Sequence, residues 1–333
     1  MSRRCLVAVV PFVIVVLVAV IAVSWMFSNP VEEGESVSLY IYPGDSGSLI
    51  ADRIDSLEIF TPRNAFRLLS LITGLDRELK IGRYDFTSED SRWDIYSTLK
   101  SGRSSSVKIT IPEGWQLKRT LPVLAESTAT DLENLWALSS DSSFLKSLGI
   151  SAASLEGYLF PQTYKLPWGA PPKYTLAVLV ESLDSFLTDS MRSRMQDLGF
   201  NIHELLTFAS LVESEAMVGS ERATISSVYH NRLRKHMLLQ CDPTVIYAHG
   251  GLDRQLLRKD MKIDSPYNTY MYAGLPPGPI CSPGAESIIA SLYPEQTSYL
   301  YFVADGTGKH IFSTTLKQHN AAISKIKSKT STR

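Results

Sequence analysis

The sequence predicts an α+β protein that consists of a single N-terminal transmembrane helix, a small mixed domain and a larger mixed domain. The first observation is an unbroken apolar run from Cys5 to Val23. The second is the pattern of the remaining chain, which changes repeatedly between the alternation of short strands and the spacing of amphipathic helices. About 300 residues follow the run, enough to bury a full core and to form two domains.

The apolar run has the length of a membrane-spanning helix, because its nineteen residues rise about 28 Å. Arg3 and Arg4 precede the run and acidic residues follow it, which places the N-terminus in the cytoplasm. We therefore expect residues 1–28 to form a cytoplasmic N-terminus and transmembrane anchor, with membrane contact through residues 5–27. The protein would then be a single-pass protein of the cytoplasmic (inner) membrane, with its main body outside the cytoplasm.

A cleaved signal peptide is the alternative interpretation of this segment. Ala22-Val23-Ser24 resembles a cleavage site, in which small residues surround the scissile bond. The run is longer than the apolar core of an ordinary signal peptide, and this length favours a retained anchor.

A small domain is predicted over residues 36–111. Val37 to Tyr42 alternates between apolar and polar residues and reads as a half-buried strand, followed by a turn and a short helix. Thr61-Pro62 is predicted to open a second helix as N-cap and first helical residue, and Gly74 to end it. Lys80 to Phe86 reads as the next strand.

A third helix and a closing strand complete this domain. Ser91 and Asp94 have the spacing of a capping box, and Gly102 ends the helix. The alternating stretch 107–111 reads as the closing strand. The strand-helix-helix-strand order that begins at Val37 resembles a LysM module, a small fold that binds glycan strands, so we expect a LysM-like membrane-proximal domain.

The larger domain is predicted over residues 112–325, with a basic tail at 326–333 that we interpret as a solvated helix end. Its first half is mainly helical. Asn201 and Glu204 form a second capping box, which starts the helix that carries two closely spaced glutamates. Near the C-terminus, two short strands around the turn Asp305–Gly308 predict a β-hairpin, and a last helix starts at about Thr315.

A series of motifs in this domain resembles the endolytic murein transglycosylases, the MltG or YceG-like family. The resemblance covers roughly residues 36 to 325 and rests on these stretches: A-S-L-V-E-S-E-A (209–216), N-R-L (231–233), L-Q-C-D-P-T-V-I-Y (239–247), Y-N-T-Y (267–270), G-L-P-P-G-P-I (274–280) and Y-L-Y-F-V (299–303). It implies a lytic transglycosylase catalytic domain that cuts the β-1,4 bond between N-acetylmuramic acid and N-acetylglucosamine within nascent peptidoglycan. It also implies a role in ending glycan elongation, with cell-wall synthases of the elongation or division machinery as partners.

Two glutamates are candidates for the catalytic acid. On a helical wheel Glu213 and Glu215 lie on opposite edges of one apolar stripe, so periodicity does not choose between them. The resemblance assigns the role to Glu215, the second glutamate of the pair. Its apolar neighbours would help a carboxyl to keep its proton, as a general acid requires. For Glu213 an orienting role and simple solvation remain open.

A single well-placed glutamate favours a transglycosylase over a hydrolase. A hydrolase ordinarily needs a second carboxylate, and Asp242 and Asp264 are the nearby acidic residues. Asp242 directly precedes Pro243, which is more typical of a turn or helix cap. In the related enzymes the 6-hydroxyl of the sugar attacks its own anomeric carbon and leaves a 1,6-anhydro end. A hydrolytic muramidase and a non-catalytic peptidoglycan-binding anchor that recruits synthases are the alternatives.

Polar and aromatic residues of the same motifs could hold the glycan. The residues of suitable chemistry are Glu213, Gln240, Asp242, Tyr267, Asn268, Thr269 and Tyr270. The alternative interpretation of the Y-N-T-Y segment is a buried turn whose polar groups are satisfied within the protein.

Several classes of ligand are excluded or disfavoured. A net charge of -1 without a basic stripe does not predict nucleic-acid binding. The six histidines have no zinc-binding spacing and no phosphate-binding loop is present, so we expect neither a metal nor another cofactor. Cys241 and Cys281 lie outside the predicted membrane segment, either as a disulfide that joins two groove loops or as two separate buried thiols.

Overall fold

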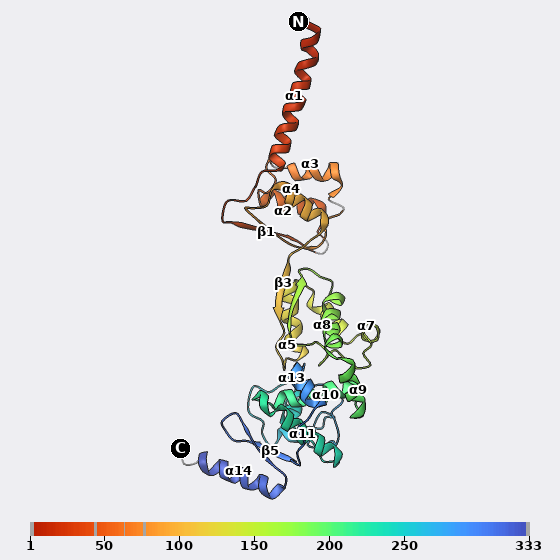
Figure 1. Cartoon of the computed structure of the whole chain (residues 1–333), viewed down its shortest axis with the longest axis vertical. Coiled ribbons are helices and arrows are strands. Elements are labelled where there is room, and N and C mark those ends of the chain that lie inside the picture. The colour runs from red at the N-terminus through yellow and green to blue at the C-terminus, as the bar shows by residue number, and fades with distance from the viewer. Residues whose placement is uncertain (1–2, 43–44, 63, 76–77, 331–333) are drawn as a thin grey trace. The chain divides into compact units, whose positions relative to one another are not determined.

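The computed structural model describes residues 3–42, 45–62, 64–75 and 78–330, and the side chains of residues 10–328 within them. Figure 1 shows the course of the chain, and its principal elements follow in order. They are α1 (Arg3–Met26), β1 (Ser36–Ile41), α2 (Gly47–Ser56), α3 (Ala65–Thr73), β2 (Gly82–Thr87), α4 (Arg92–Ser101), β3 (Ser106–Thr110), α5 (Leu117–Thr128), α6 (Leu132–Ser139), α7 (Ser142–Ser147), β4 (Thr163–Pro167), α8 (Pro172–Phe186), α9 (Asp189–Asp197), α10 (Ile202–Glu215), η2 (Gly219–Glu221), α11 (Arg222–Arg234), α12 (Asp242–Ala248), η3 (Asp260–Lys262), α13 (Ala285–Leu292), β5 (Tyr301–Ala304), β6 (His310–Ser313) and α14 (Leu316–Thr330).

The chain forms two compact units, and the mixture of helices with small antiparallel sheets confirms the α+β class. Unit 1 comprises residues 1–108 together with 127–130 and 165–171, and unit 2 comprises the remainder. The predicted boundary lay between residues 111 and 112. The two short segments that join unit 1 from later in the chain carry no signal in the sequence.

Unit 1 is built around an antiparallel pair of strands. β1 and β2 pair in register from Ser36 opposite Thr87 to Ile41 opposite Gly82. Leu39 and Ile41 point into the core, as their alternation predicts, and pack there with Tyr84. The order β1-α2-α3-β2 is the predicted strand-helix-helix-strand order.

The predicted ends of two helices in unit 1 are confirmed. Ser91 and Asp94 form the capping box of α4 with both reciprocal hydrogen bonds present. Gly74 and Gly102 end α3 and α4 in the left-handed conformation, with φ of 70° and 66°, which glycine adopts without steric cost.

The predicted start of α3 is wrong. The helix begins at Ala65 after the N-cap residue Asn64, and not at Thr61-Pro62. Thr61 is engaged in tertiary contacts instead. Its carbonyl accepts a hydrogen bond of 2.6 Å from Trp25 Nε1, and its hydroxyl accepts one of 3.4 Å from Arg92 Nη2.

The strand expected to close the small domain has a different partner. β3 pairs with β4 in a separate two-stranded sheet. Among the described residues, Ser105, which directly precedes β3, forms an isolated antiparallel bridge with Arg83 of β2. The sequence alone did not indicate β4 as the partner strand.

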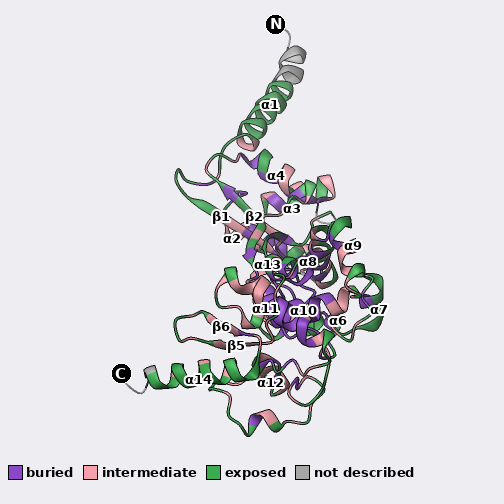
Figure 2. Cartoon of the chain, turned by 60° about the horizontal axis from the view of Figure 1, so that its bottom comes forward, coloured by how far each residue is buried: buried purple, intermediate pink, exposed green. Residues whose placement is uncertain are grey.

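The large apolar side chains described along α1 are exposed (Figure 2). Over the residues that the structure describes, no helix combines the length and the apolar character needed to cross a membrane.

α10 is the central helix of unit 2. The predicted capping box of Asn201 and Glu204 starts it, and every residue from Leu205 to Val212 is buried, as Figure 2 shows. It packs against α13, α11 and α12. A core that includes Phe208, Leu211 and Tyr229 therefore fixes its C-terminal end.

The predicted hairpin and last helix are confirmed. β5 and β6 pair antiparallel from Tyr301 opposite Ser313 to Ala304 opposite His310, and α14 follows. The hairpin contributes Phe302 and Phe312 to the edge of the core around α10. This places β5 beside the end of the helix that carries the two glutamates.

Candidate active site

Glu215 is the last residue of α10 and opens onto a cavity of about 370 Å³. α11, α12, the hairpin and α14 provide the other walls. The residues that line the cavity are Glu215, Arg232, Leu239, Gln240, Asp242, Tyr270, Phe302, Val303, Ala304, His310 and His319. The cavity therefore combines one helix-terminal carboxyl with amide, hydroxyl and aromatic groups, which is the chemistry that a sugar-binding site requires.

The surroundings of Glu215 favour its protonated form. Burial is the main cause that raises the pKa of this carboxyl above its ordinary value, and the charge of Asp242 raises it further. Hydrogen bonds from the Cys241 thiol and from Tyr229 act in the opposite direction, and Tyr229 Oη lies 3.2 Å from Glu215 Oε1. Because burial outweighs these bonds, Glu215 has the properties of a general acid.

Cationic and potentially cationic side chains lie across the same cavity. Arg232 is buried and donates hydrogen bonds of 2.7 Å to the Leu300 carbonyl and 2.8 Å to the Leu239 carbonyl. His310 Nδ1 lies 2.7 Å from Glu221 Oε2. These contacts fix the position of Arg232 in the wall of the cavity and pair His310 with Glu221.

His319 differs from His310. Its ring stacks on Tyr301 with 5.3 Å between centroids, and its buried Nδ1 has no hydrogen-bond partner among the described residues. Burial and the nearby Arg232 lower the pKa of His319, so the ring is neutral near pH 7.

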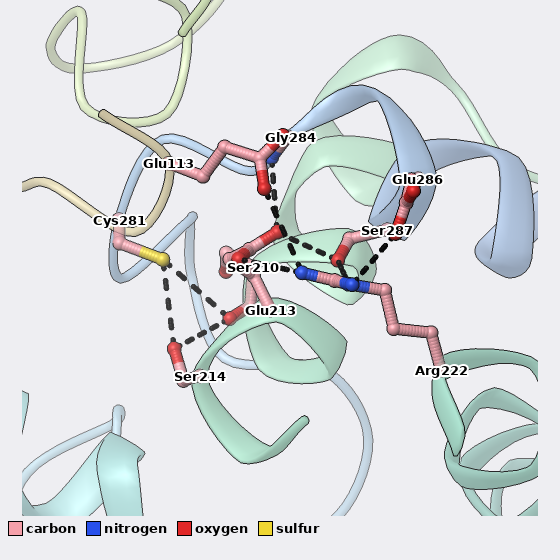
Figure 3. A network of polar contacts seen from close by, with 9 residues as sticks. All are labelled: Glu113, Ser210, Glu213, Ser214, Arg222, Cys281, Gly284, Glu286 and Ser287. Carbon is pink, nitrogen blue, oxygen red and sulfur yellow. Dashed lines mark hydrogen bonds and ion pairs between the residues drawn. The ribbon is translucent and has the colours of Figure 1, made fainter. Parts of the chain in front are cut away.

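Glu213 is part of a separate polar network, shown in Figure 3. Its Oε2 accepts hydrogen bonds of 3.1 Å from the Gly284 amide and 2.6 Å from Ser287 Oγ, and its Oε1 lies 3.5 Å from Arg222 Nη2. With 8% of its side chain exposed, Glu213 is not solvated. It ties α10 to the start of α13 and is not among the residues that line the cavity of Glu215.

The loop P-E-G-W (112–115) joins this network through Glu113. Glu113 lies 3.6 Å from Arg222, while burial and the charge of Glu213 raise its pKa. The loop is fixed by hydrogen bonds between Gly114 N and the Ser282 carbonyl (2.9 Å) and between Ser282 N and the Trp115 carbonyl (2.8 Å). A Cβ atom at Gly284 would lie 2.0 Å from the Glu113 carboxyl, so a larger residue there would displace the Glu113 side chain from its present position.

Three of the predicted substrate-binding residues share the cavity with Glu215. Tyr270 Oη donates a 2.5 Å hydrogen bond to Asp242 Oδ1. Gln240 has a left-handed φ of 51°, and its backbone N–H donates a hydrogen bond of 3.1 Å to the Thr269 carbonyl. Asp242 is the first residue of α12, whose N-cap is Cys241, so it is not the cap residue; it lines the cavity.

The other residues of the Y-N-T-Y motif do not line this cavity. Asn268 is fully buried, and its Nδ2 donates to the carbonyls of Met261 (2.9 Å) and Ile263 (2.8 Å). Thr269 Oγ1 accepts a 2.9 Å bond from Cys241 N. Tyr267 packs on Tyr247, with 4.8 Å between ring centroids. The motif is a buried turn that positions Tyr270 and Cys241.

The two cysteines are free and buried, so the alternative of two separate thiols describes them and the disulfide does not form. The Cys241 thiol lies beside Glu215 and donates to its carboxyl. Cys281 lies 3.5 Å from Ser214 Oγ and 3.6 Å from the Ser210 carbonyl. They therefore occupy different sides of the end of α10.

Sequence reasoning missed Tyr229 and Arg232 as site residues. Both lie on α11, where a spacing of three residues puts them on one face. Arg232 belongs to the N-R-L motif and Tyr229 lies three residues before it, and this spacing was the available signal. Within the described part of the chain, no group of three or more His, Cys, Asp or Glu side chains could hold a metal ion.

Comparison with known proteins identifies the family. The model of the YceG-like family matches residues 39–325. The chain belongs to the YceG-like family. An endolytic murein transglycosylase of Bacillus subtilis (strain 168) is 35% identical over 314 residues, which cover 88% of this chain and 86% of the relative.

More distant relatives agree with this assignment. An endolytic murein transglycosylase of Streptococcus pneumoniae serotype 2 is 30% identical over 275 residues, covering 73% of this chain and 50% of the relative. The crystal structure of a YceG-like protein from Listeria monocytogenes matches with a TM-score of 0.60 and 30% identity, covering 86% of this chain and 98% of that one.

Proposed function

We propose that this chain is an endolytic peptidoglycan transglycosylase in which Glu215 is the catalytic residue. The observation that carries the proposal is the carboxyl of Glu215, which lines a polar and aromatic cavity and whose pKa is raised by burial. The names of the relatives from Bacillus subtilis and Streptococcus pneumoniae supply the reaction class.

In the proposed reaction one carboxyl acts twice. Protonated Glu215 donates its proton to the oxygen of the β-1,4 bond between N-acetylmuramic acid and N-acetylglucosamine, and the bond from the anomeric carbon to that oxygen breaks. The 6-hydroxyl of the muramic acid residue then forms a new bond to the anomeric carbon and returns its proton to Glu215. The products are a 1,6-anhydro end and a new 4-hydroxyl end.

A hydrolytic muramidase is the second candidate, because Asp242 lines the same cavity as Glu215. In a hydrolase this carboxylate would activate water or attack the sugar. The hydrogen bond from Tyr270 to Asp242 favours a positioning role, since it occupies one carboxylate oxygen.

The chemistry of the product ends tests both candidates. Purified uncrosslinked glycan is digested and the new ends are analysed by mass spectrometry. Anhydro ends are expected, and Asp242→Asn should still produce them at a reduced rate. Reducing ends that disappear in Asp242→Asn would establish hydrolysis, and a wild-type chain without cleavage would be a binding protein.

We also propose that the chain is anchored in the cytoplasmic membrane with its main body outside the cytoplasm. The apolar run begins at Cys5, before the side chains that the structure describes, and Arg3 and Arg4 precede it. Protease added outside intact spheroplasts should degrade the main body of the protein. Complete protection would contradict this orientation.

The strand-helix-helix-strand part of unit 1 acts, in this proposal, as a LysM-like glycan-binding module, supported by its element order and antiparallel β1–β2 pair. Cleavage of nascent strands beside the cell-wall synthases would end strand elongation. Glycan strands that lengthen when the wild-type protein is replaced by Glu215→Gln would support this role, and unchanged strand lengths would contradict it.

A further inference from the structure

α3 is apolar on two opposite faces. Phe66 points into the core of unit 1 and is fully buried. On the outer face Leu68, Leu71 and Ile72 have exposed fractions of 62%, 82% and 75%. Their spacing of three and four residues places them side by side on the helix. An exposed apolar patch of this kind marks an interaction surface, so this outer face needs a partner.

The inner flank of α3 lies beside the end of α1. Met26 of α1 lines one cavity of about 560 Å³ together with Leu69 and Thr73 of α3. In Figure 1, α3 follows directly below the lower end of α1 and runs across the direction of that helix. A bilayer plane that α1 crosses along its length would therefore run along α3.

The end of α1 is fixed to unit 1 by specific contacts. Trp25 Nε1 donates to the Thr61 carbonyl at 2.6 Å, and its ring packs against Phe60 with 6.1 Å between centroids. The guanidinium of Arg92 lies over the Trp25 ring, 5.0 Å from its centroid, and Arg92 Nη1 donates to Ser28. These contacts hold α3 at a set position next to α1, without a flexible linker between them.

Aromatic side chains continue the apolar surface between the two helices. Phe27 and Trp93 are both exposed, and their ring centroids are 6.2 Å apart. Exposed Trp and other aromatic rings are typical of the boundary between lipid and water. Lys100 lies at the edge of the same cavity, where its ammonium could reach lipid phosphates.

We propose that the outer face of α3, formed by Leu68, Leu71 and Ile72, lies in the interfacial layer of the phospholipid bilayer. The proposal rests on the membrane anchor put forward under the proposed function. Lipid is the occupant because α3 lies beside the end of α1, whose described apolar side chains are exposed, and because the three residues of the face are apolar. Arg67, the charged residue of α3, pairs with Asp52. α3 would then be an in-plane amphipathic helix that seats unit 1 on the membrane.

A fluorescent probe attached at Leu71 tests this proposal in the full-length chain. Leu71→Cys is made in a Cys5→Ser background, where Cys241 and Cys281 are buried and do not compete for the label. The labelled chain is reconstituted in vesicles of phosphatidylcholine and phosphatidylglycerol that carry nitroxide lipids near the headgroup. We expect the label at position 71 to lose most of its emission by quenching.

Ile81→Cys is the matched control, because Ile81 is also an exposed apolar residue of unit 1. The other end of β2 is held near α1 by a 2.7 Å hydrogen bond from Asn29 Nδ2 to the Ser88 carbonyl. The six residues of β2 from Thr87 to Gly82 span about 17 Å, so Ile81 lies beyond the end of the strand that is remote from this contact. Its label should keep its emission.

A second variant tests the face itself. The double variant Leu71→Glu, Ile72→Glu changes only exposed positions, so folding should be preserved. In this background a label attached at Leu68→Cys should no longer be quenched by the nitroxide lipids. Equal quenching at positions 71 and 81, or no quenching at 71 in chains that float with the vesicles, would overturn the proposal and would leave the face to water or to a protein partner.

Failure of the underlying anchor gives a different result. A full-length chain that does not float with vesicles overturns both the anchor and the lipid-facing role of α3. Cleavage of glycan by the detergent-solubilised chain is measured in parallel, since it depends on Glu215 and not on α3.

Discussion

Tyr229 Oη lies 3.2 Å from Glu215 Oε1, and this hydrogen bond joins the middle of one buried helix to the end of another. Tyr229 is almost completely buried and packs edge-on against Phe208 of α10, so its hydroxyl cannot move far. The bond fixes the orientation of the Glu215 carboxyl. It also favours the ionised form of Glu215, against the effect of burial.

Removal of this hydrogen bond should change the pH dependence of cleavage. Tyr229→Phe removes a donor that lowers the pKa of Glu215, so the pKa of Glu215 should rise further. A general acid loses activity as the pH rises through its pKa, and the alkaline limb of kcat/KM should therefore move to higher pH. Tyr247→Phe is the matched control, since Tyr247 lies outside this cavity. An alkaline limb that stays in place would show that Tyr229 does not tune the acid.

Glu215→Gln should abolish cleavage while the fold is preserved. Glutamine keeps the shape of the side chain and can still accept the Tyr229 hydrogen bond, but it has no carboxyl proton to donate. Loss of a general acid typically lowers the rate by about 10² to 10⁴. Circular dichroism and a thermal melt check the fold, and turnover within a few-fold of wild type would rule out Glu215 as the acid.

Glu213→Gln should affect stability more than chemistry. The buried Glu213 carboxylate accepts two hydrogen bonds and pairs with Arg222, so its loss should lower the free energy of unfolding by about 1–3 kcal/mol. Glu286→Gln removes another partner of the same arginine at a side chain that is 69% exposed, and should cost no more than about 1 kcal/mol. Urea unfolding compares the two variants. A greater loss of activity in Glu213→Gln than in Glu215→Gln would reverse the assignment of the two glutamates.

Glu156 should make stability depend on pH. Its carboxyl is buried and accepts hydrogen bonds of 3.1 and 3.3 Å from Leu117 N, and burial raises its pKa from 4.5 to about 7. The folded state thus prefers the protonated form. The resulting stabilisation is complete below the pKa of the unfolded chain and is lost as the pH rises from about 4.5 through 7.

The size of this effect is about 3 kcal/mol by the linkage between pKa and folding. Glu156→Gln cannot ionise, so its free energy of unfolding should fall less than that of the wild type between pH 5 and pH 8. Denaturation at the two pH values measures the difference. Parallel pH dependence of the two proteins would show that the carboxyl is solvated in the native state.

Both cysteines outside α1 should be alkylated without reductant, but only after unfolding. Cys241 and Cys281 are buried as free thiols, and burial raises the pKa of Cys281 to about 12, which disfavours the reactive thiolate. Mass spectrometry after treatment with iodoacetamide, with and without denaturant, counts the modified thiols. An unreduced protein that stays unmodified in denaturant would contain the disulfide that the structure lacks.

The sequence indicated those parts of the fold whose determinants are local. The capping boxes at Ser91 and at Asn201 depend on residues that are three positions apart. The end of α4 depends on the left-handed conformation of one residue, Gly102. Thr61 failed as a helix start because its polar groups bind Trp25 and Arg92, which lie 36 and 31 residues away. Such contacts between residues far apart in the sequence do not appear in the local helix propensity of Thr61-Pro62.

The site shows the same division between local and distant determinants. The motif position of Glu215 in the sequence was enough to propose it as the acid. The environment of Glu213 was not predictable, because its partners Gly284 and Ser287 lie more than 70 residues away. Asn268 has suitable chemistry for binding sugar, yet its side-chain amide already donates hydrogen bonds to the backbone carbonyls of Met261 and Ile263.

The position of Glu215 at the end of α10 also bears on how the enzyme would return to its starting state. The C-terminus of a helix carries about half a negative charge, so an ionised carboxylate there, near Asp242, is electrostatically unfavourable. Once Glu215 has given its proton to the leaving oxygen, the same surroundings make it a stronger base than a carboxylate in water. It can then recover a proton from the sugar hydroxyl, and each cut would leave the enzyme ready for the next without help from a second acidic residue or from solvent.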